Sequence, residues 1–532
     1  MESSLLGQSF VGFRRTTDRG SSFKALNPAT RQELEPSFFT AAEKDLDAAV
    51  SLAEEAFRSY GSLSGAARAA FLRAIASEME ASGDELIARA HLESGLPLAR
   101  LQGELARTCG QLRMFASVAE EGSWASARID RADPSRKPLP KPNVRSVLRP
   151  LGPVAIFGAS NFPLAFSVAG GDTASALAAG TPVIVKAHSA HPGTSELTAN
   201  AIQRALRTCR LPEGTFSMLF DGGFSIGSAL VRHPGICGVA FTGSLKGGRA
   251  LYDLACNRPH PIPFYGELGS CNPLFILPGA MRARGSQIAS QLFQSITVGG
   301  GQFCTKPGIV FLPPQNATKE FLATLNAAVV QSSPFTMLTP GIGSAFSNAI
   351  ANREQEGTVA VAARSESQTS AQSVAAQPIL FDTSVATYLS HPELEKEIFG
   401  PTSLLVHYGA MKELLDAARA LDGHLTVTVH AEEEDVKEFS ELLSILEKKA
   451  GRLIYNGFPT GLEVCHAMVH GGPYPATTDS RSTSVGSMAI FRFARPVAYQ
   501  DFPDGGLPQE LQNSNPLKIW RLLDGSWTKD AA

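Results

Sequence analysis

Val154-Ala155-Ile156-Phe157-Gly158 and Pro182-Val183-Ile184-Val185-Lys186 are short apolar runs separated by an Ala-rich segment with helical spacing. Runs of this length indicate buried strands, and strand, helix, strand is the pattern of a βαβ unit with parallel strands. A third run, Gly238-Val239-Ala240-Phe241, leads into a Gly-rich turn and the start of a helix. We therefore predict an α/β fold with a parallel sheet, whose ligands bind at the carboxyl ends of the strands.

The sequence on either side of this unit consists of segments that differ in composition and in hydrophobic periodicity. Residues 41–109 carry apolar residues at helical spacing, and residues 131–150 contain five prolines, which favour an extended connector or arm. A second α/β alternation follows between 267 and 452, interrupted at 365–377 by a Ser/Ala/Gln-rich segment that we expect to be an exposed loop. Residues 484–506 alternate apolar and polar side chains in part, as over 488–493, which predicts an exposed strand able to pair with another chain. A chain of 532 residues is longer than a single hydrophobic core usually supports, so at least two domains are expected.

Charge and cysteine usage exclude several classes of protein. The net charge is -3 and the basic residues are scattered, so we expect no nucleic-acid binding. The seven cysteines are odd in number and form no CxxC pair, which argues against disulfides and against a thiolate metal site. Residues 1–15 lack a signal-peptide core, and Asp172 and Pro182 interrupt the least polar stretch, so we expect no membrane span. A cytoplasmic protein without a metal is the expectation.

Cys304 is the first candidate for chemistry, because it follows Gly299-Gly300-Gly301-Gln302-Phe303. Three glycines allow a tight backbone segment that a substrate can approach closely. A free cysteine on its own is more often a small buried apolar residue than a nucleophile, so the assignment depends on its surroundings.

Three further polar residues follow predicted strands or lie at a presumed domain junction. Glu267 has a loop acid or a helix cap as its ordinary explanation, Asn161 a turn, and Lys186 a solvated charge. The turn from Gly243 to Gly248 is neither the GxGxxG dinucleotide fingerprint nor a P-loop, so its pattern alone is weak.

The order of these motifs resembles the aldehyde dehydrogenase superfamily over nearly the whole chain. The motifs are Asn27-Pro28-Ala29-Thr30, Asn161-Phe162-Pro163, Lys186, Phe241-Thr242-Gly243-Ser244, Glu267-Leu268-Gly269, Gly301-Gln302-Phe303-Cys304 and Glu397-Ile398-Phe399-Gly400-Pro401. The resemblance implies Cys304 as the nucleophile, Glu267 as the general base, and Asn161 with the Cys304 backbone N–H as the oxyanion hole. The cofactor would be held by Lys186, Gly243, Ser244, Gly248, Glu397 and Phe399.

The same resemblance implies an architecture and a product. It predicts a cofactor-binding domain (1–130 and 152–266), a catalytic domain (267–481), and an oligomerisation arm with a C-terminal tail (131–151 and 482–532). Both domains would be Rossmann-like, the arm would be a small β unit, and the chain would form a homodimer or homotetramer. Family members that pass the acyl group to coenzyme A lack the glutamate, so Glu267 favours a free carboxylic acid product.

One departure from the family pattern concerns the cofactor. Many members have Lys-Pro-x-Glu after the second strand, whereas this chain has Lys186-Ala187-His188-Ser189. Loss of the acid removes repulsion against a 2′-phosphate, and Ser189 can donate a hydrogen bond to it. We therefore expect NADP to be preferred, with NAD also possible; in the alternative, Ser189 is neutral and another residue sets the preference.

A second departure indicates a narrower branch. The stretches 267–273, 456–461 and 463–477 resemble bacterial α-ketoglutarate semialdehyde (2,5-dioxovalerate) dehydrogenases and the related fatty aldehyde dehydrogenase of luminous vibrios. The vibrio relative has a histidine in its catalytic pocket, and His466 is the position we match to it; a structural histidine is the alternative. His466 and Arg481 are candidates to bind a substrate carboxylate; in the alternative, Arg481 pairs with Asp479 at the surface.

The sequence thus predicts NAD(P)-dependent oxidation of an aldehyde to an acid through a thioester on Cys304, with α-ketoglutarate semialdehyde as the favoured substrate. A medium- or long-chain aliphatic aldehyde dehydrogenase is the alternative enzyme. A non-catalytic structural or binding protein on the same fold is the remote alternative, since a fold alone does not determine function.

Overall fold

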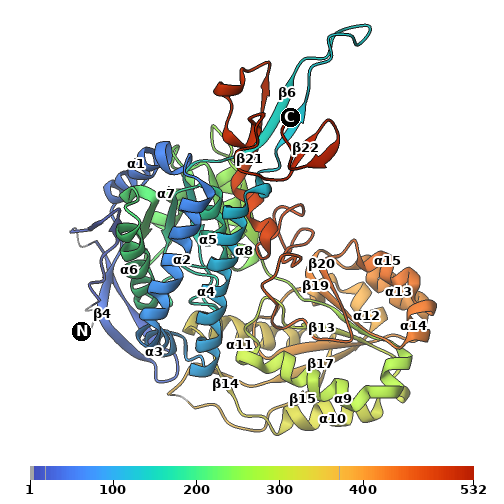
Figure 1. The fold of residues 1–532 in the computed structure, drawn as a ribbon. Helices are drawn as coiled ribbons and strands as arrows, with labels where there is room; N and C mark the ends of the chain where they lie inside the picture. The colour runs from blue at the N-terminus through green and yellow to red at the C-terminus, as the bar shows by residue number, and fades with distance from the viewer. Residues whose placement is uncertain (1–4, 18–19, 371) are drawn as a thin grey trace.

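The computed structural model describes residues 5–17, 20–370 and 372–532, which form two α/β lobes and an arm (Figure 1). The first lobe is built on a seven-stranded sheet in the order β11-β10-β7-β8-β9-β1-β2. The strands from β11 to β9 run parallel, and β1 and β2 add an antiparallel edge. The strand bounds are β1 (Phe10–Val11), β2 (Arg14–Arg15), β7 (Val154–Phe157), β8 (Val183–Lys186), β9 (Phe216–Leu219), β10 (Gly238–Thr242) and β11 (Phe264–Glu267).

Helices cover both faces of this sheet. The strands carry apolar side chains on both faces, and these side chains must be buried. Val154 and Ile156 lie in a core with α2 to α6, whereas Ala155 and Phe157 lie in a second core with α1, α7 and α8. A hairpin of β3 (Ser22–Asn27) and β4 (Gln32–Phe39) lies beside them. The helices are α1 (Glu43–Tyr60), α2 (Gly65–Ala81), α3 (Gly83–Ser94), α4 (Leu98–Glu121), α5 (Gly171–Ala179), α6 (Pro192–Thr208), α7 (Ser225–Arg232) and α8 (Leu245–Cys256).

The chain order of the strands reverses between β7 and β10. From β7 the chain moves outward through β8 and β9, and it then returns to the other side through β10 and β11. Such a switch point is where open α/β sheets bind ligands, at the carboxyl ends of the strands. Asn161 follows β7, Lys186 ends β8 and Glu267 ends β11, so three of the predicted site residues lie along this edge.

The second lobe has another seven-stranded sheet, in the order β15-β17-β18-β13-β12-β19-β20. Only β15 is antiparallel to its neighbour. The strands are β12 (Leu274–Ile276), β13 (Ile309–Leu312), β15 (Ala360–Arg364), β17 (Ile379–Ser384), β18 (Thr402–His407), β19 (His424–His430) and β20 (Ala450–Tyr455). The helices are α9 (Pro278–Thr297), α10 (Lys319–Val330), α11 (Pro340–Gln355), α12 (Val385–Ser390), α13 (Met411–Ala420), α14 (Glu433–Glu438) and α15 (Ser440–Leu446).

The segment predicted as an exposed loop over 365–377 is exposed only in part. Several of its described residues are exposed, but Val374 and Ala376 are buried. Within it, β16 (Ala375–Ala376) pairs with β14 (Phe335–Thr336).

The arm projects from the first lobe and combines two distant segments of the chain (Figure 1). Its sheet has the order β21-β6-β5-β22-β23, and β21 pairs with the strand formed by the end of the Pro-rich segment. The bounds are β5 (Arg128–Asp130), β6 (Val144–Pro150), β21 (Ala494–Gln500), β22 (Arg521–Leu523) and β23 (Ser526–Thr528).

The exposed strand predicted within 484–506 is present as β21, but the alternating residues 488–493 do not form it. These residues belong to a 3-10 helix, Ser487–Phe493, and the strand begins only at Ala494. The physical reason is burial: Ile490 and Phe493 join the core of the first lobe, and Arg492 forms a buried ion pair with Asp172 of α5 at 2.7 Å.

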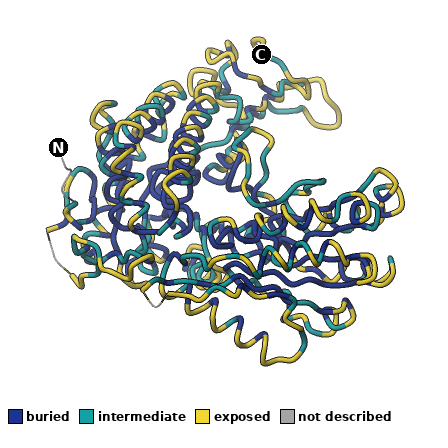
Figure 2. Tube along the Cα trace, turned by 90° about the horizontal axis from the view of Figure 1, so that it is seen from below, coloured by how far each residue is buried: buried dark blue, intermediate teal, exposed yellow. Residues whose placement is uncertain are grey.

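The α/β fold class predicted from the sequence is confirmed by these two largely parallel sheets and the separate β arm. Figure 2 shows buried residues through the middle of both lobes and exposed residues on their outer helices and loops. Within the described part of the chain, no helix combines the length and the apolar character needed to cross a bilayer.

Candidate functional site

Cys304 lies just after a tight glycine turn, the 3-10 segment Val298–Gly301. Gly299, Gly300 and Gly301 all have positive φ, between 60° and 67°. A side chain on Gly301 would also lie 2.3 Å from the Gly400 carbonyl oxygen, so backbone conformation and space both require glycine there. The turn holds Cys304 half-buried at the junction of the two lobes.

The thiol of Cys304 lies beside a buried acid and a buried histidine. Its Sγ is 3.6 Å from Nε2 of His470, and the same nitrogen is 2.9 Å from Oε1 of Glu267. Glu267 and His470 are almost fully buried. If Cys304 acts as a nucleophile, His470 and Glu267 are therefore both close enough to accept its proton.

Pairing between the end of β11 and the segment that follows β20 fixes this arrangement. Glu267 forms a β-bridge with Thr477, and the Leu268 N–H donates to the Ala476 carbonyl at 2.8 Å. The hydroxyl of Ser484 donates to Oε2 of Glu267 at 2.9 Å, and the Ser484 N–H donates to the His470 carbonyl at 2.8 Å. Both carboxylate oxygens of Glu267 thus face groups from one loop.

Burial and local charge together raise the pKa of Cys304 and lower that of Glu267. Burial, followed by the charge of Glu267, raises the pKa of the Cys304 thiol well above its ordinary value. Burial also acts to raise the pKa of Glu267, but His470, Ser484 and Cys304 together outweigh it and hold that pKa below its ordinary value. The resting site therefore pairs a protonated thiol with an ionised carboxylate.

Asn161 brings a side-chain amide to the same place. Its Nδ2 donates to the Gln302 carbonyl at 3.0 Å, two residues before the thiol. Arg100 of α4 in turn donates to the Asn161 carbonyl at 2.7 Å. The amide is thus held as a hydrogen-bond donor close to Cys304.

Two residues predicted to hold the cofactor provide a donor and an acceptor at this edge. Burial lowers the pKa of Lys186, and the structure records no hydrogen bond or ion pair of its ammonium within the described residues. Glu397 lies over Gly269, where an added Cβ would be 2.3 Å from its Oε2, and burial raises its pKa. A free ammonium and a carboxylate over a glycine fit the ribose hydroxyls of a dinucleotide.

The remaining predicted cofactor residues occupy different surroundings. Ser244 caps α8 by accepting a hydrogen bond from the Gly247 N–H at 3.2 Å, and Ser189 is half-buried after β8. Gly248 packs against Leu268 and Phe241 and leaves no space for a side chain, so it serves helix packing. Phe399 packs beside Leu101 and Leu338, whereas Gly243 donates its N–H to the Glu267 carbonyl at 3.1 Å.

The histidine beside the thiol is not the one matched from the sequence. His466 is exposed, and its carbonyl accepts a hydrogen bond from Ser487, whereas His470 occupies the position against Cys304 and Glu267. The only sequence signal was that His470 precedes Gly471-Gly472. Arg481 pairs with Asp479 at 3.3 Å, with its side chain 91% exposed, which is the surface alternative.

Three residues of types that can bind a metal ion lie together in this site, although the sequence led us to expect no metal. Donor atoms of Glu267, Cys304 and His470 all lie within 4.8 Å of one another. Sequence spacing could not show this, because each residue comes from a different part of the chain. The same three groups suffice for thiol chemistry that needs no metal.

Comparison with known proteins agrees with this geometry. Residues 14–478 match the model of the aldehyde dehydrogenase family. The chain is 48% identical to the "alpha-ketoglutaric semialdehyde dehydrogenase 2" of Azospirillum brasilense over 98% of this chain and 99% of that protein. It is 44% identical to the "alpha-ketoglutaric semialdehyde dehydrogenase" of Acinetobacter baylyi, with the same two coverages.

Solved structures show the same fold at lower identity. An NAD+ complex of an aldehyde dehydrogenase from Bacillus cereus superposes with a TM-score of 0.78 at 22% identity, covering 93% of this chain and 96% of that one. The structure of 3,6-anhydro-L-galactose dehydrogenase has a TM-score of 0.79 at 19% identity, covering 93% and 99%.

Proposed function

This chain belongs to the aldehyde dehydrogenase family, and from that premise we propose that it oxidises α-ketoglutarate semialdehyde to α-ketoglutarate, with NADP preferred over NAD. The substrate assignment is supported by sequence identities of 48% and 44%, over nearly the full length, to two proteins named alpha-ketoglutaric semialdehyde dehydrogenase. The grouping of Cys304, Glu267, His470 and Asn161 supports the chemistry.

In the first half of the reaction, Cys304 loses its proton to the pair formed by His470 and Glu267, and its sulfur attacks the aldehyde carbon. Asn161 Nδ2 and the Cys304 backbone N–H stabilise the negative charge that develops on the oxygen. A dinucleotide held by Lys186 and Glu397 would supply the acceptor for the hydride that leaves that carbon. Cys304 then carries the acyl group as a thioester.

In the second half, once the proton taken from the thiol has left to solvent, Glu267 takes a proton from water and the hydroxide attacks the thioester carbon. The carbon–sulfur bond breaks, the acid is released, and Glu267 returns the proton to the Cys304 thiolate. A carboxylate with a lowered pKa stays ionised at neutral pH and is ready for this step. The sum is aldehyde, NADP⁺ and water giving carboxylic acid, NADPH and a proton.

The preference for NADP rests on Ser189. It stands where many relatives place an acid, so a 2′-phosphate meets a hydroxyl donor instead of a negative charge. Lys186 and Glu397 would hold the ribose rings, with Phe399 beside the nicotinamide. Initial rates with NAD and NADP measured in parallel test this preference.

An aldehyde panel tests the substrate. We expect kcat/KM for α-ketoglutarate semialdehyde to exceed that for hexanal and decanal. A large advantage for the long aldehydes would instead establish the alternative, a medium- or long-chain aliphatic aldehyde dehydrogenase. The buried, charged surroundings of Cys304 favour the keto acid.

We also propose a homodimer or homotetramer assembled through the arm. Strand β21 is at the edge of the arm sheet, and Phe502, Trp520 and Trp527 of the same region are exposed. An open edge strand with exposed aromatic residues favours association. Sedimentation or light scattering of the purified protein tests it, and a monomer at micromolar concentration would contradict it.

The cysteines support a reducing compartment, and we propose the cytoplasm. All seven are free in the structure. A protein with this many unpaired thiols is suited to reducing conditions. Cell fractionation tests the location.

A further inference from the structure

One face of α4 carries three charged side chains, Arg100, Glu104 and Arg107, at the spacing that places residues on one side of a helix. Arg100 donates to the Asn161 carbonyl at 2.7 Å. Glu104 accepts from the backbone N–H groups of Leu164 and Ala165 at 2.8 and 3.0 Å. Arg100 and Glu104 therefore hold the segment that carries Asn161.

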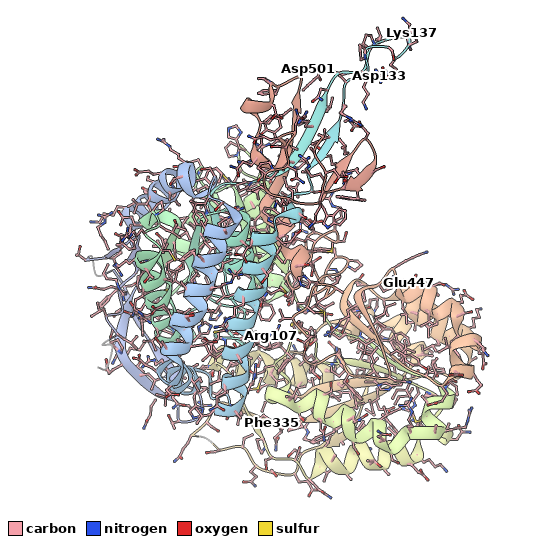
Figure 3. The ribbon with its side chains drawn as sticks, viewed as in Figure 1. Arg107, Asp133, Lys137, Phe335, Glu447 and Asp501 are labelled. Atoms are coloured by element: carbon pink, nitrogen blue, oxygen red, sulfur yellow. The ribbon has the colours of Figure 1, made fainter. Side chains whose placement is uncertain are left out.

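Arg107 does not share that task. Its Nε and Nη2 are buried and have no hydrogen-bond partner, and no ion pair is recorded for it within the described residues. Its guanidinium carbon lies 5.8 Å from the ring centre of Phe162 and 5.2 Å from that of Phe166. Figure 3 labels Arg107 on α4, on the side that faces the second lobe.

The aromatic contacts connect this arginine to the reacting groups. Phe166 lies between Arg107 and His470, with its ring centre 6.2 Å from the histidine ring. Burial lowers the pKa of Arg107, and the charges of Glu104, Cys304, Glu267 and Glu463 act against that shift. A guanidinium stays charged in such surroundings, so it supplies a cation near the thiol.

The acids around Arg107 are committed elsewhere or remote. Glu104 accepts the two N–H groups above, and Glu267 faces His470 and Ser484. Glu463 is exposed and forms no recorded ion pair with Arg107. A second cation, Arg452 of β20, lies nearby, but it donates to the Pro459 carbonyl at 2.8 Å and so anchors its own loop.

A buried guanidinium without a partner is costly, and such groups are normally paired with a carboxylate or phosphate. We propose that Arg107 binds the carboxylate at the far end of the aldehyde substrate, while Cys304 attacks the aldehyde carbon at the other end. The proposal rests on the proposed function and deepens it, because it names the residue that selects acid-bearing aldehydes. The planar fork of arginine suits a carboxylate, and the two phenylalanine rings keep water from competing.

An aldehyde without an acid leaves the guanidinium unpaired, so selectivity should follow this one residue. The test compares Arg107→Met with the wild type on α-ketoglutarate semialdehyde, 4-oxobutanoate and pentanal. Arg113→Met is the matched control, because Arg113 is on the same helix but pairs with Glu80 on the exposed side. We expect Arg107→Met to lower kcat/KM for both acid aldehydes by roughly 30-fold or more, mainly through KM.

The same variant should leave pentanal within about 2-fold, and Arg113→Met should change none of the three substrates. Equal loss with pentanal would overturn the proposal, because Arg107 would then act on the thiol or on the fold. Retained selectivity for the acids would overturn it as well. Arg107→Lys, which keeps the charge without the fork, should recover part of the selectivity.

Failure of the proposed function gives a different result. If the wild type prefers 4-oxobutanoate to the keto acid, the substrate assignment fails, while loss of that preference in Arg107→Met still supports the carboxylate site. If the wild type does not favour either acid over pentanal, both proposals fail. Competitive inhibition of pentanal oxidation by α-ketoglutarate, lost in Arg107→Met, provides a readout that needs no acid aldehyde.

Discussion

Nε2 of His470 lies 2.9 Å from Oε1 of Glu267 and 3.6 Å from Sγ of Cys304, so one imidazole contacts both the acid and the thiol. The three residues come from the end of β11, the glycine turn before Cys304, and the segment after β20. In the reaction we propose, a single proton can therefore pass between the groups that serve its two halves.

Replacing His470 should alter both rate and pH dependence. In His470→Gln, burial of Glu267 is no longer offset by the ring, so its pKa should rise and the acid limb of kcat should move to higher pH. We expect kcat to fall by roughly 10- to 100-fold at neutral pH. The matched control, His466→Gln, changes an exposed histidine and should leave the pH profile unchanged. The same shift in both variants would contradict the assignment to His470.

The free enzyme should show a slowly reacting Cys304. Because burial and the Glu267 charge raise the pKa of this thiol, its alkylation by iodoacetamide should keep accelerating beyond about pH 8.5, where an ordinary cysteine levels off. Peptide mass spectrometry can follow Cys304 separately, with exposed Cys256 as the reference. A plateau below neutral pH at Cys304 would show a resting thiolate.

Cofactor preference should respond to residue 189. In Ser189→Glu, a carboxylate would face the 2′-phosphate, and kcat/KM with NADP should fall by roughly 30-fold or more while that with NAD is retained. Ser189→Ala removes only the hydroxyl donor and should reduce NADP use modestly. An unchanged NADP-to-NAD ratio in Ser189→Glu would assign the preference to another residue.

The 3-10 helix before the arm should contribute strongly to stability. Arg492 forms a buried pair with Asp172, and burial already raises the pKa of that acid. Arg492→Met leaves Asp172 without its partner, so the free energy of unfolding should decrease by about 3 kcal/mol. Urea unfolding measures it, with exposed Arg495→Met as the control. Equal stability of the two variants would show that the pair contributes little.

Local patterns predicted much of the fold, because strands such as Val154–Phe157 and Val183–Lys186 are apolar runs with turns at their ends. Such patterns also placed Asn161 and Lys186 at the ends of strands, whereas Glu267 was expected at a domain junction and proves to end β11. The apparent strand over 488–493 shows the limit: its alternation arises from burial against α5, which depends on tertiary contacts.

The full set of residues around Cys304 was harder to predict than Cys304 itself. His470 reaches Cys304 only because the segment after β20 pairs with β11 at Thr477, and no local pattern encodes that pairing. Arg107 lies in an ordinary helical stretch, and its importance depends on Phe162 and Phe166 covering the same face of α4.

The most direct test of the mechanism is a rapid-mixing measurement of NADPH formation by Glu267→Gln. If Cys304 is acylated and Glu267 serves hydrolysis, a burst stoichiometric with the active sites should remain while steady turnover falls by roughly 100-fold or more. Cys304→Ala should show neither burst nor turnover. Equal loss of burst and turnover in Glu267→Gln would contradict this division of roles.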